Sequence, residues 1–321
     1  MRALVMGRRL VAAVSLLQIV ACGGGSDAAT PTGPGAGLTG PGLTWTAVTA
    51  PTGATTWRGV AYGSGTWVAV GNGARASSVL GATWTSVAVT SASYSFMTNV
   101  LFANGLFVVS GGQGVSTSAG GTTFTSQLLT ASQALTGLAY GNGTWVMMDD
   151  RFLSSDVLAF FTSTTGGAWT QALTAIPYAQ PTSVAFGNSV FVAVGYGGLV
   201  ATSANGTAWV QRSLASTSDL GVISVTFANA LFVAVTNSGK AYRSADGITW
   251  TKATVTVNGL YGIAYGNGVF AAVGAAGSIF TSADAITWTR RTWSGPTTDF
   301  NGVFYANAKF IAAGNSFAES H

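Results

Sequence analysis

The chain of 321 residues has few of the side chains that carry most enzyme chemistry: one cysteine, Cys22, one histidine, His321, and one glutamate, Glu319. This inventory excludes histidine-based catalytic triads, thiol catalysis and metal sites built from histidine or cysteine. Glycosidases need two carboxylates that face each other across the scissile bond. Asp149 and Asp150 are adjacent, so on a strand they would point to opposite faces. We therefore expect no catalytic residue, no metal and no cofactor.

Long apolar runs are also missing. The longest follows three arginines and covers 12 residues, Leu10 to Ala21, which is too short for a membrane-spanning helix but typical of a secretory signal peptide over residues 1–21. The run ends in Ile19-Val20-Ala21-Cys22, which resembles the bacterial lipobox. That resemblance implies cleavage before Cys22 and lipidation of its thiol, and Gly23 after it implies retention in the outer membrane of a Gram-negative cell. The alternative is an ordinary signal peptide followed by a chance cysteine.

Charge is sparse, at 7% of residues. Three of the thirteen basic residues lie in the signal peptide, so ten remain against nine acidic ones and the processed chain carries about +1. Nucleic-acid binding needs a basic surface that survives processing, so we do not expect it. Residues 22–41 comprise the cysteine and a Gly-, Pro- and Thr-rich stretch that reads as a flexible tether. Residues 42–321 are expected to form one domain.

A unit of about 40 residues recurs along this domain and is clearest from Gly262 to Thr289. Within it we predict four short strands, since small, aromatic and β-branched residues alternate between Gly-, Asn- or Asp-containing turns. They are Ile263–Tyr265, Val269–Val273, Ser278–Thr281 and Thr287–Thr289. Asn267-Gly268 favours a type I′ hairpin between the first two. Each unit is therefore predicted to be a small antiparallel sheet.

Two ladders of aromatic residues define the repeat. Gaps of 38 to 46 residues separate the members of the first, at the start of the second strand: Trp67, Phe107, Trp145, Phe191, Phe232, Phe270 and Phe310. The second ladder is assigned to the fourth strand: Trp84, Phe124, Trp169, Trp209, Trp250 and Trp288. The last unit lacks this half, and the segment Thr39 to Trp45 matches it. These features predict a seven-bladed β-propeller closed by an N-terminal strand that completes the last blade. An outer-membrane barrel is the competing fold, although turns recur too often for its longer strands.

A seven-residue motif precedes the second ladder, with its fullest forms at Ser244, Asp246, Gly247 and Trp250 and at Ser282, Asp284 and Trp288. It resembles the Asp-box, or BNR repeat, of sialidase-like and photosystem II assembly factor-like propellers, shortened by one residue. The carboxylate can accept backbone N–H bonds in a tight turn, so the motif reads as structural. The resemblance to sialidases implies an arginine cluster and a Tyr–Glu pair in the active site, and neither is visible in this sequence.

Recognition is expected at the opposite end of the propeller, where the loops vary. Aromatic residues beside Arg or Asp in these loops suit sugar stacking or a protein hot spot. An insertion in the third blade, Met148 to Phe160, concentrates charge and is interpreted either as a solvated loop or as a specificity loop. The candidate binding residues are Trp57, Arg58, Asp149, Asp150, Arg151, Asp156, Tyr178, Tyr196, Trp293 and Asp299.

The expected function is that of a non-catalytic, monomeric lipoprotein of the cell envelope, held to the membrane by its lipid alone. Its propeller would serve as a protein-interaction or assembly scaffold, as the resemblance to assembly factor-like propellers also implies. A carbohydrate-binding propeller is the alternative, and a degenerate sialidase-like glycosidase is a more distant one.

Overall fold

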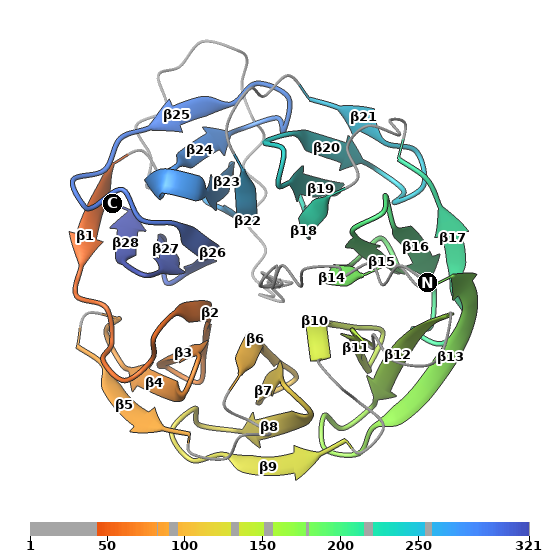
Figure 1. The fold of residues 1–321 in the computed structure, drawn as a ribbon, viewed down its shortest axis with the longest axis horizontal. Helices are drawn as coiled ribbons and strands as arrows, with labels where there is room; N and C mark the ends of the chain where they lie inside the picture. The colour runs from red at the N-terminus through yellow and green to blue at the C-terminus, as the bar shows by residue number, and fades with distance from the viewer. Residues whose placement is uncertain are drawn as a thin grey trace, which may run out of the picture.

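The computed structural model describes residues 44–81, 83–89, 96–129, 135–150, 157–177, 180–214, 221–253 and 259–320. These residues form seven four-stranded antiparallel sheets arranged around a central axis (Figure 1). The fold is the predicted seven-bladed β-propeller. In the described part of the chain, no helix is long and apolar enough to cross a membrane.

The blades follow one another along the chain. Blades 1 to 3 consist of β2 Trp57–Gly63, β3 Thr66–Gly71, β4 Ala74–Ser78 and β5 Thr85–Ala88; β6 Met97–Ala103, β7 Leu106–Gly111, β8 Gly114–Ser118 and β9 Thr125–Leu128; and β10 Leu135–Gly141, β11 Thr144–Asp149, β12 Val157–Ser163 and β13 Thr170–Pro177. Blades 4 and 5 consist of β14 Pro181–Gly187, β15 Val190–Gly195, β16 Val200–Ser203 and β17 Val210–Arg212; and β18 Val222–Ala228, β19 Leu231–Thr236, β20 Ala241–Ser244 and β21 Thr251–Lys252. Blade 6 consists of β22 Leu260–Gly266, β23 Val269–Gly274, the 3-10 turn η1 Ala275–Gly277, β24 Ile279–Ser282 and β25 Thr289–Arg291. Blade 7 consists of β26 Phe300–Ala306, β27 Lys309–Gly314, β28 Phe317–Ser320 and β1 Trp45–Val48.

The ring closes where the two ends of the described chain meet. Strand β1 pairs antiparallel with β28, in a register that runs from Trp45 opposite Ser320 to Val48 opposite Phe317 (Figure 1). Blade 7 is therefore built from both ends, as predicted, and β28 has no free edge. Glu319 lies in this closing sheet and accepts a 2.8 Å salt bridge from Lys309 Nζ.

Turn residues set the hairpins between the first two strands of each blade. Asn267 and Gly268 both have positive φ, of 46° and 78°, as a type I′ turn requires. The predicted strands of this unit are confirmed, with shifted bounds: β22 begins at Leu260, and β25 begins only at Thr289. The fourth strand starts late because the N–H groups of Ile286 and Thr287 donate to Asp284 Oδ1 and remain in the turn. The second ladder of aromatics thus ends this turn, just before the strand, rather than lying in the fourth strand.

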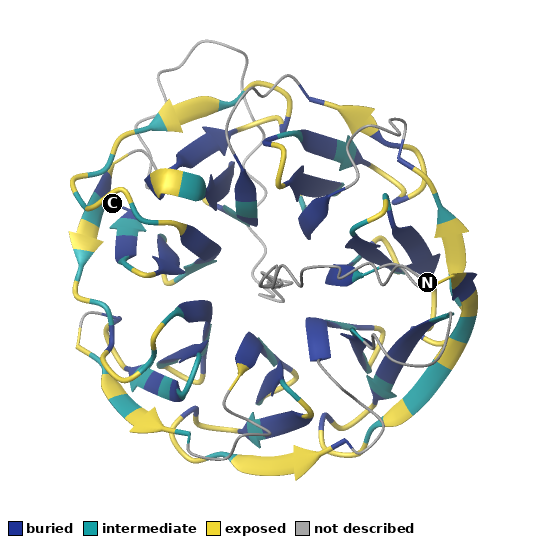
Figure 2. Cartoon of the chain, in the orientation of Figure 1, coloured by how far each residue is buried: buried dark blue, intermediate teal, exposed yellow. Residues whose placement is uncertain are grey.

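Burial falls from the inner strands to the outer ones. All seven aromatics of the first ladder are fully buried, at 0% exposure. Among strand residues, the exposed positions lie on the outermost strands β1, β5, β9, β13, β17, β21 and β25 (Figure 2). Second-ladder aromatics pack between blades: the ring of Trp209 stacks on Phe160 of the preceding blade at 3.8 Å, with an interplanar angle of 8°. Apolar contact between blades thus stabilises the ring.

A β-bulge near the start of the innermost strand recurs in every blade. The bulge falls on the second residue of the strand in six blades, as at Arg58 and Thr98, and on Gly137 in blade 3. Bulges twist a strand and leave one residue unpaired, so that its side chain is available for other contacts. Hydroxyls at these second positions reach the next blade: Thr98 Oγ1 donates to Leu135 O at 3.0 Å, and Thr182 Oγ1 to Val222 O at 2.9 Å.

Candidate functional site

The two ends of the propeller carry different connections between strands. We call "box end" the end that carries the turn between the first two strands of each blade and the turn before the fourth strand, including Ser244–Trp250. We call "loop end" the opposite end, with the connection between the second and third strands and the links between blades. The sequence predicts structural turns at the box end and recognition at the loop end.

Hydrogen bonds within the turn define the box end. Ser244 Oγ accepts the N–H of Gly247 at 2.8 Å, and Asp246 Oδ1 accepts the N–H groups of Ile248 and Thr249, both at 2.8 Å. The indole of Trp250 then donates to Gly247 O at 3.1 Å. All of these bonds lie within the turn, so the geometry supports a structural role for the Asp246 carboxylate.

Other blades make the same turn with weaker acceptors. Asn205 Oδ1 accepts the N–H groups of Thr207 and Ala208 at 3.0 and 2.9 Å, so an amide replaces the carboxylate. A hydroxyl does so in blade 3, where Thr165 Oγ1 accepts the N–H of Gly167 at 3.2 Å. The turn therefore tolerates loss of the aspartate charge.

Both box carboxylates have lowered pKa values. The N–H groups of Thr249 and Ile248 lower the pKa of Asp246 below its ordinary value of 3.8, with a smaller contribution from the hydroxyl of Ser244. Partial burial would raise the pKa of Asp284, but hydrogen bonds from its own turn outweigh this effect and lower it. Both groups are therefore carboxylate anions at neutral pH, held by dipoles.

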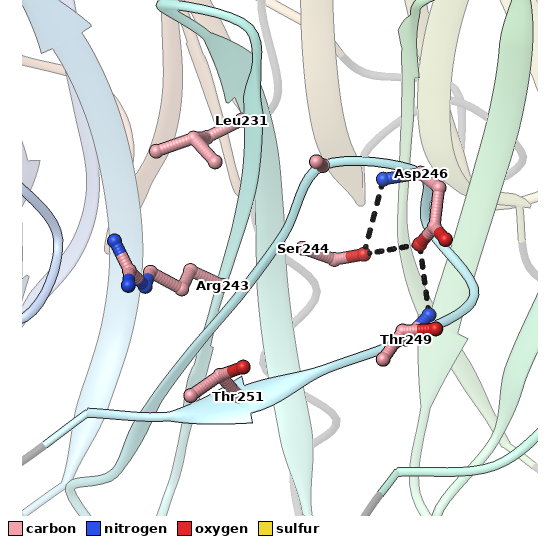
Figure 3. Close-up of a pocket in the computed structure, with 7 residues that line it drawn as sticks. Leu231, Arg243, Ser244, Asp246, Thr249 and Thr251 are labelled. Atoms are coloured by element: carbon pink, nitrogen blue, oxygen red, sulfur yellow. Dashed lines mark hydrogen bonds between the residues drawn. The ribbon is translucent and has the colours of Figure 1, made fainter.

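A pocket of about 350 Å³ lies at the box end of blade 5 (Figure 3). It is lined by Leu231, Arg243, Ser244, Ala245, Asp246, Thr249 and Thr251. Its two charged side chains are already engaged: Asp246 holds its own turn, and Arg243 Nη1 donates to Asp284 O of blade 6 at 3.5 Å. One of them thus holds a turn and the other links two blades, so neither marks the pocket as a ligand site.

At the loop end, polar and aromatic side chains from blades 4 to 7 gather on one side. Tyr196 follows β15, Asn237 follows β19, Tyr261 is the bulge residue of β22, and Asp299 precedes β26. Burial raises the pKa of Tyr261, and the nearby charges of Asp299 and Tyr196 raise it further. Burial also raises the pKa of Tyr196, opposed by a hydrogen bond with Asn237. Four repeats thus bring two phenols, an amide and a carboxylate together; we call them the tyrosine cluster.

Asp299 anchors this cluster to blade 6. Its Oδ1 accepts the N–H of Ala276, in the turn η1, at 2.9 Å, and the residue is exposed. Ala276 has φ of 51°, a left-handed conformation in which its N–H turns toward the carboxylate. The remaining oxygen of Asp299 and the phenol of Tyr261 provide an acceptor and a ring for a donor-rich ligand.

Blades 1 and 2 hold a cationic counterpart. The guanidinium of Arg58 lies over the Phe96 ring, 4.5 Å from its centroid, and Nε donates to Asn72 Oδ1 at 3.0 Å. Asn72 and Phe96 are joined by a backbone bridge, so both contacts come from a fixed frame. The same kind of bridge joins Tyr196 to Gly221 between blades 4 and 5.

One predicted binding aromatic is a packing residue instead. Trp57 is 2% exposed and its indole donates to Pro51 O at 2.9 Å, so it offers no surface for a ligand. Trp293 is half-buried, with its ring tilted by 54° and centred 4.8 Å from that of Phe300, and it makes a backbone bridge with Trp45; its role in binding stays a prediction. The sequence does not distinguish packing from binding here, because an indole in a link between blades can either pack against the neighbouring blade or face a ligand.

The third-blade insertion is partly strand. Met148 and Asp149 end β11, and β12 begins at Val157, so the predicted loop from Met148 to Phe160 is wrong at both ends. Its outer part lengthens the hairpin of β12 and β13, with Val157 opposite Pro177. Asp149 is 1% exposed and hydrogen-bonding or charge partners are already available to it, which corrects its assignment as a surface binding residue. Asp150 Oδ2 accepts a bond from Gln180 Nε2 at 3.5 Å.

Some predicted residues lie outside the described part of the chain. They are Cys22, Arg151, Asp156, Tyr178 and His321. In the ranges that the structure describes, no group of three or more His, Cys, Asp or Glu side chains could hold a metal ion.

Tyr261, Asn237 and Asn72 were missed by the sequence reading of the binding site. The sequence holds a signal for Tyr261 alone. The second residues of the seven innermost strands are, in chain order, Arg58, Thr98, Thr136, Thr182, Ile223, Tyr261 and Asn301. Only Arg58 and Tyr261 in this series combine a large side chain with a polar group that a ligand could use.

Comparisons with known proteins agree with the fold. A family model described as DUF6242 beta propeller domain matches residues 182–310. Virginiamycin B lyase from Staphylococcus aureus is similar in structure, with TM-score 0.74 and 11% identity over 87% of this chain and 99% of that one. YCF48 bound to D1 peptide has TM-score 0.66 and 18% identity over 86% and 96%. The WD40 propeller domain of Doa1 has TM-score 0.69 and 11% identity over 88% and 97%. A search of curated proteins found no match.

Proposed function

We propose that this protein is a non-catalytic, lipid-anchored propeller of the bacterial cell envelope whose loop end binds a polypeptide segment. The observation that carries the proposal is the tyrosine cluster: blades 4 to 7 each contribute a different side chain to one neighbourhood, with Tyr261 close to both Asp299 and Tyr196. Half-buried phenols beside a carboxylate combine apolar area with hydrogen-bonding groups, which is typical of peptide and protein hot spots.

One structural neighbour is consistent with a polypeptide ligand. YCF48 was solved bound to D1 peptide, and Doa1 is a further propeller of similar fold. Both likenesses are below 25% identity and support the fold alone, so the case for a polypeptide depends on the loop end of this chain.

The inventory of side chains supports the absence of catalysis. Another neighbour is a catalytically inactive histidine-to-alanine variant of virginiamycin B lyase with quinupristin. The only histidine of this chain is His321, and its only glutamate is the salt-bridged Glu319. Asp299 is the one carboxylate among the four residues of the tyrosine cluster, so the cluster lacks the pair of carboxylates that a glycosidase needs.

The proposed location in the cell envelope depends on the first 41 residues. A signal peptide over 1–21, lipidation of Cys22 and a tether over 22–41 would place the propeller at the outer membrane of a Gram-negative cell. Expression with a labelled fatty acid tests this: label should enter the wild type and be absent from Cys22→Ser. Equal labelling of both would contradict the lipid anchor without affecting the loop-end site.

The binding function is tested with full-length protein in detergent on a peptide array and a glycan array. We expect wild type to bind a subset of peptides, and Tyr261→Ala and Asp299→Asn to weaken those signals by about tenfold or more, as for hot-spot residues. Thr249→Ala, in the box-end pocket, is the matched control and should leave them unchanged. Binding to glycans alone, or peptide binding that is insensitive to the loop-end variants, would overturn the proposal.

A further inference from the structure

Arg58 stands apart from the residues at equivalent positions in other blades. Four of these donate to the first carbonyl of the next blade: Thr98, Thr136 and Thr182 through Oγ1 and Asn301 through Nδ2. Arg58 instead turns back to Asn72 of its own blade. It makes no such hydrogen bond to blade 2 among the described residues and meets that blade through the Phe96 ring, so the hydrogen bonds that link blades do not explain why an arginine is there.

Packing fixes the guanidinium on two sides. Phe96 covers its plane at 4.5 Å, and Asn72 occupies Nε. The bridge between Asn72 and Phe96 holds both partners in the same frame. Phe96 is 39% exposed, which places the stack at the surface of the loop end. The two Nη groups are left as a rigid fork with no hydrogen-bond partner among the described residues.

Arg58 is buried without a carboxylate partner among the described residues. The residue is 6% exposed, and burial lowers the pKa of its guanidinium. The only salt bridge between described residues joins Lys309 to Glu319, on a different strand pair. A buried charge with no counter-ion is costly unless something else supplies that counter-ion. The free protein therefore bears a cost that an anionic ligand would remove.

Guanidinium geometry narrows the ligand class. With Nε occupied, the two Nη groups present parallel N–H donors, which match the two oxygens of a carboxylate. Stacking on Phe96 fixes the plane in which those oxygens must lie. A polypeptide has such a group at its C-terminus and on each Asp or Glu side chain.

We propose that Arg58 is the anion-binding residue of the loop end and that it takes a carboxylate of the bound polypeptide between its two Nη groups. This assignment rests on the proposed function. It divides the loop end into a cationic subsite in blades 1 and 2, formed by Arg58, Asn72 and Phe96, and the tyrosine cluster of blades 4 to 7.

A second arginine provides a matched control. Arg75 lies over Phe124 at 4.4 Å, also joins blade 1 to blade 2, and also has its pKa lowered by burial. It lies on β4, beside a shallow hollow lined by Thr85, Gly121 and Thr122 toward the box end, and it is half-buried. The two arginines share the aromatic stack and differ in the end of the propeller that they face.

The test uses full-length protein in detergent and peptides chosen from the array in matched pairs: Glu against Gln at each acidic position, and free C-terminal acid against amide. We expect one pair type to differ by about tenfold or more with wild type, the strength of a bidentate charged hydrogen bond. The pair type that differs identifies the source of the carboxylate. Arg58→Met should abolish that difference, Arg58→Lys should reduce it, and Arg75→Met should retain it.

Thermal unfolding separates recognition from a structural role. Because Arg58→Met replaces a buried, unpaired charge with an apolar chain of similar length, its melting temperature should equal or exceed that of wild type. A clear loss of stability in Arg58→Met would show that Arg58 is structural and would overturn the assignment. Peptides bound equally with and without carboxylates would overturn it while sparing the proposed function. No peptide binding by wild type would instead defeat the proposed function.

Discussion

At the box end, the same bond recurs in five blades: a serine hydroxyl accepts a glycine N–H at 2.8 to 2.9 Å. At the loop end, the seven positions equivalent to Arg58 carry five residue types, from isoleucine to arginine. Both ends are built on the same backbone repeat. Where a turn packs against the preceding blade, as Gly247 does against Val192, the serine–glycine bond recurs. A bulged residue at the loop end can change without breaking a strand pair.

The largest effect is expected from Gly247→Ala at the box end. Gly247 has φ of 73°, and an added Cβ would lie 2.5 Å from Val192 Cγ2 of blade 4. Strain and overpacking together should cost about 2 to 4 kcal/mol in the free energy of unfolding, measured by urea denaturation.

Gly268→Ala is the control for that substitution. Its φ is 78°, but an added Cβ would meet nothing within 4 Å, so only the strain of about 1 to 2 kcal/mol applies. Equal losses in the two variants would contradict the view that the box glycine acts as a wedge between blades. Peptide binding by the folded fraction should be unchanged in both.

A smaller effect of opposite sign is expected from Ala285→Gly. Ala285 takes the place of the box glycine in blade 6 with φ of 58°, a conformation that strains a residue with a Cβ. Relief of this strain should exceed the entropic cost of glycine and stabilise the protein by about 0.3 to 1 kcal/mol. Destabilisation in the same denaturation experiment would show that packing of the buried methyl group outweighs the strain.

The smallest effect concerns acid sensitivity. Because its pKa is lower folded than the ordinary 3.8, Asp246 stabilises the fold above that value, and this contribution is lost as pH falls through the folded pKa. The amide of Asp246→Asn can accept the same N–H bonds, as Asn205 does, but does not titrate. The stability of wild type relative to Asp246→Asn should therefore decrease between neutral pH and pH below 3.8. A difference that is constant with pH would contradict the role of the charge.

Much of the fold could be predicted from the sequence. The spacing of aromatics such as Phe191 and Phe232 gave the blade number, because a residue buried at the same place in every sheet must recur with the repeat. The Asn267-Gly268 hairpin and the closing strand around Trp45 were predictable for the same reason: local chemistry and repeat register agree there. The start of β25 was not, since Thr287 looks like a strand residue until its N–H is used by Asp284.

The candidate site was less predictable. Trp57 is an aromatic beside an arginine, as a binding residue could be, and only the packing of the blades shows that it is buried. Tyr261 falls just before the predicted unit and its first strand, in a stretch that the sequence assigns to a link between blades, and the bulge that positions it has no strong sequence signature. Arg58 was included for its type, but its lack of a counter-ion is visible only in three dimensions.

Hydrogen–deuterium exchange of full-length protein, with and without its strongest array peptide, tests the central claim most directly, namely that recognition belongs to the loop end. Slower exchange on binding is expected around Asn72, Phe96 and η1, with no change in the box turn Ser244–Trp250. Protection of the box turn with an unchanged loop end would contradict the account.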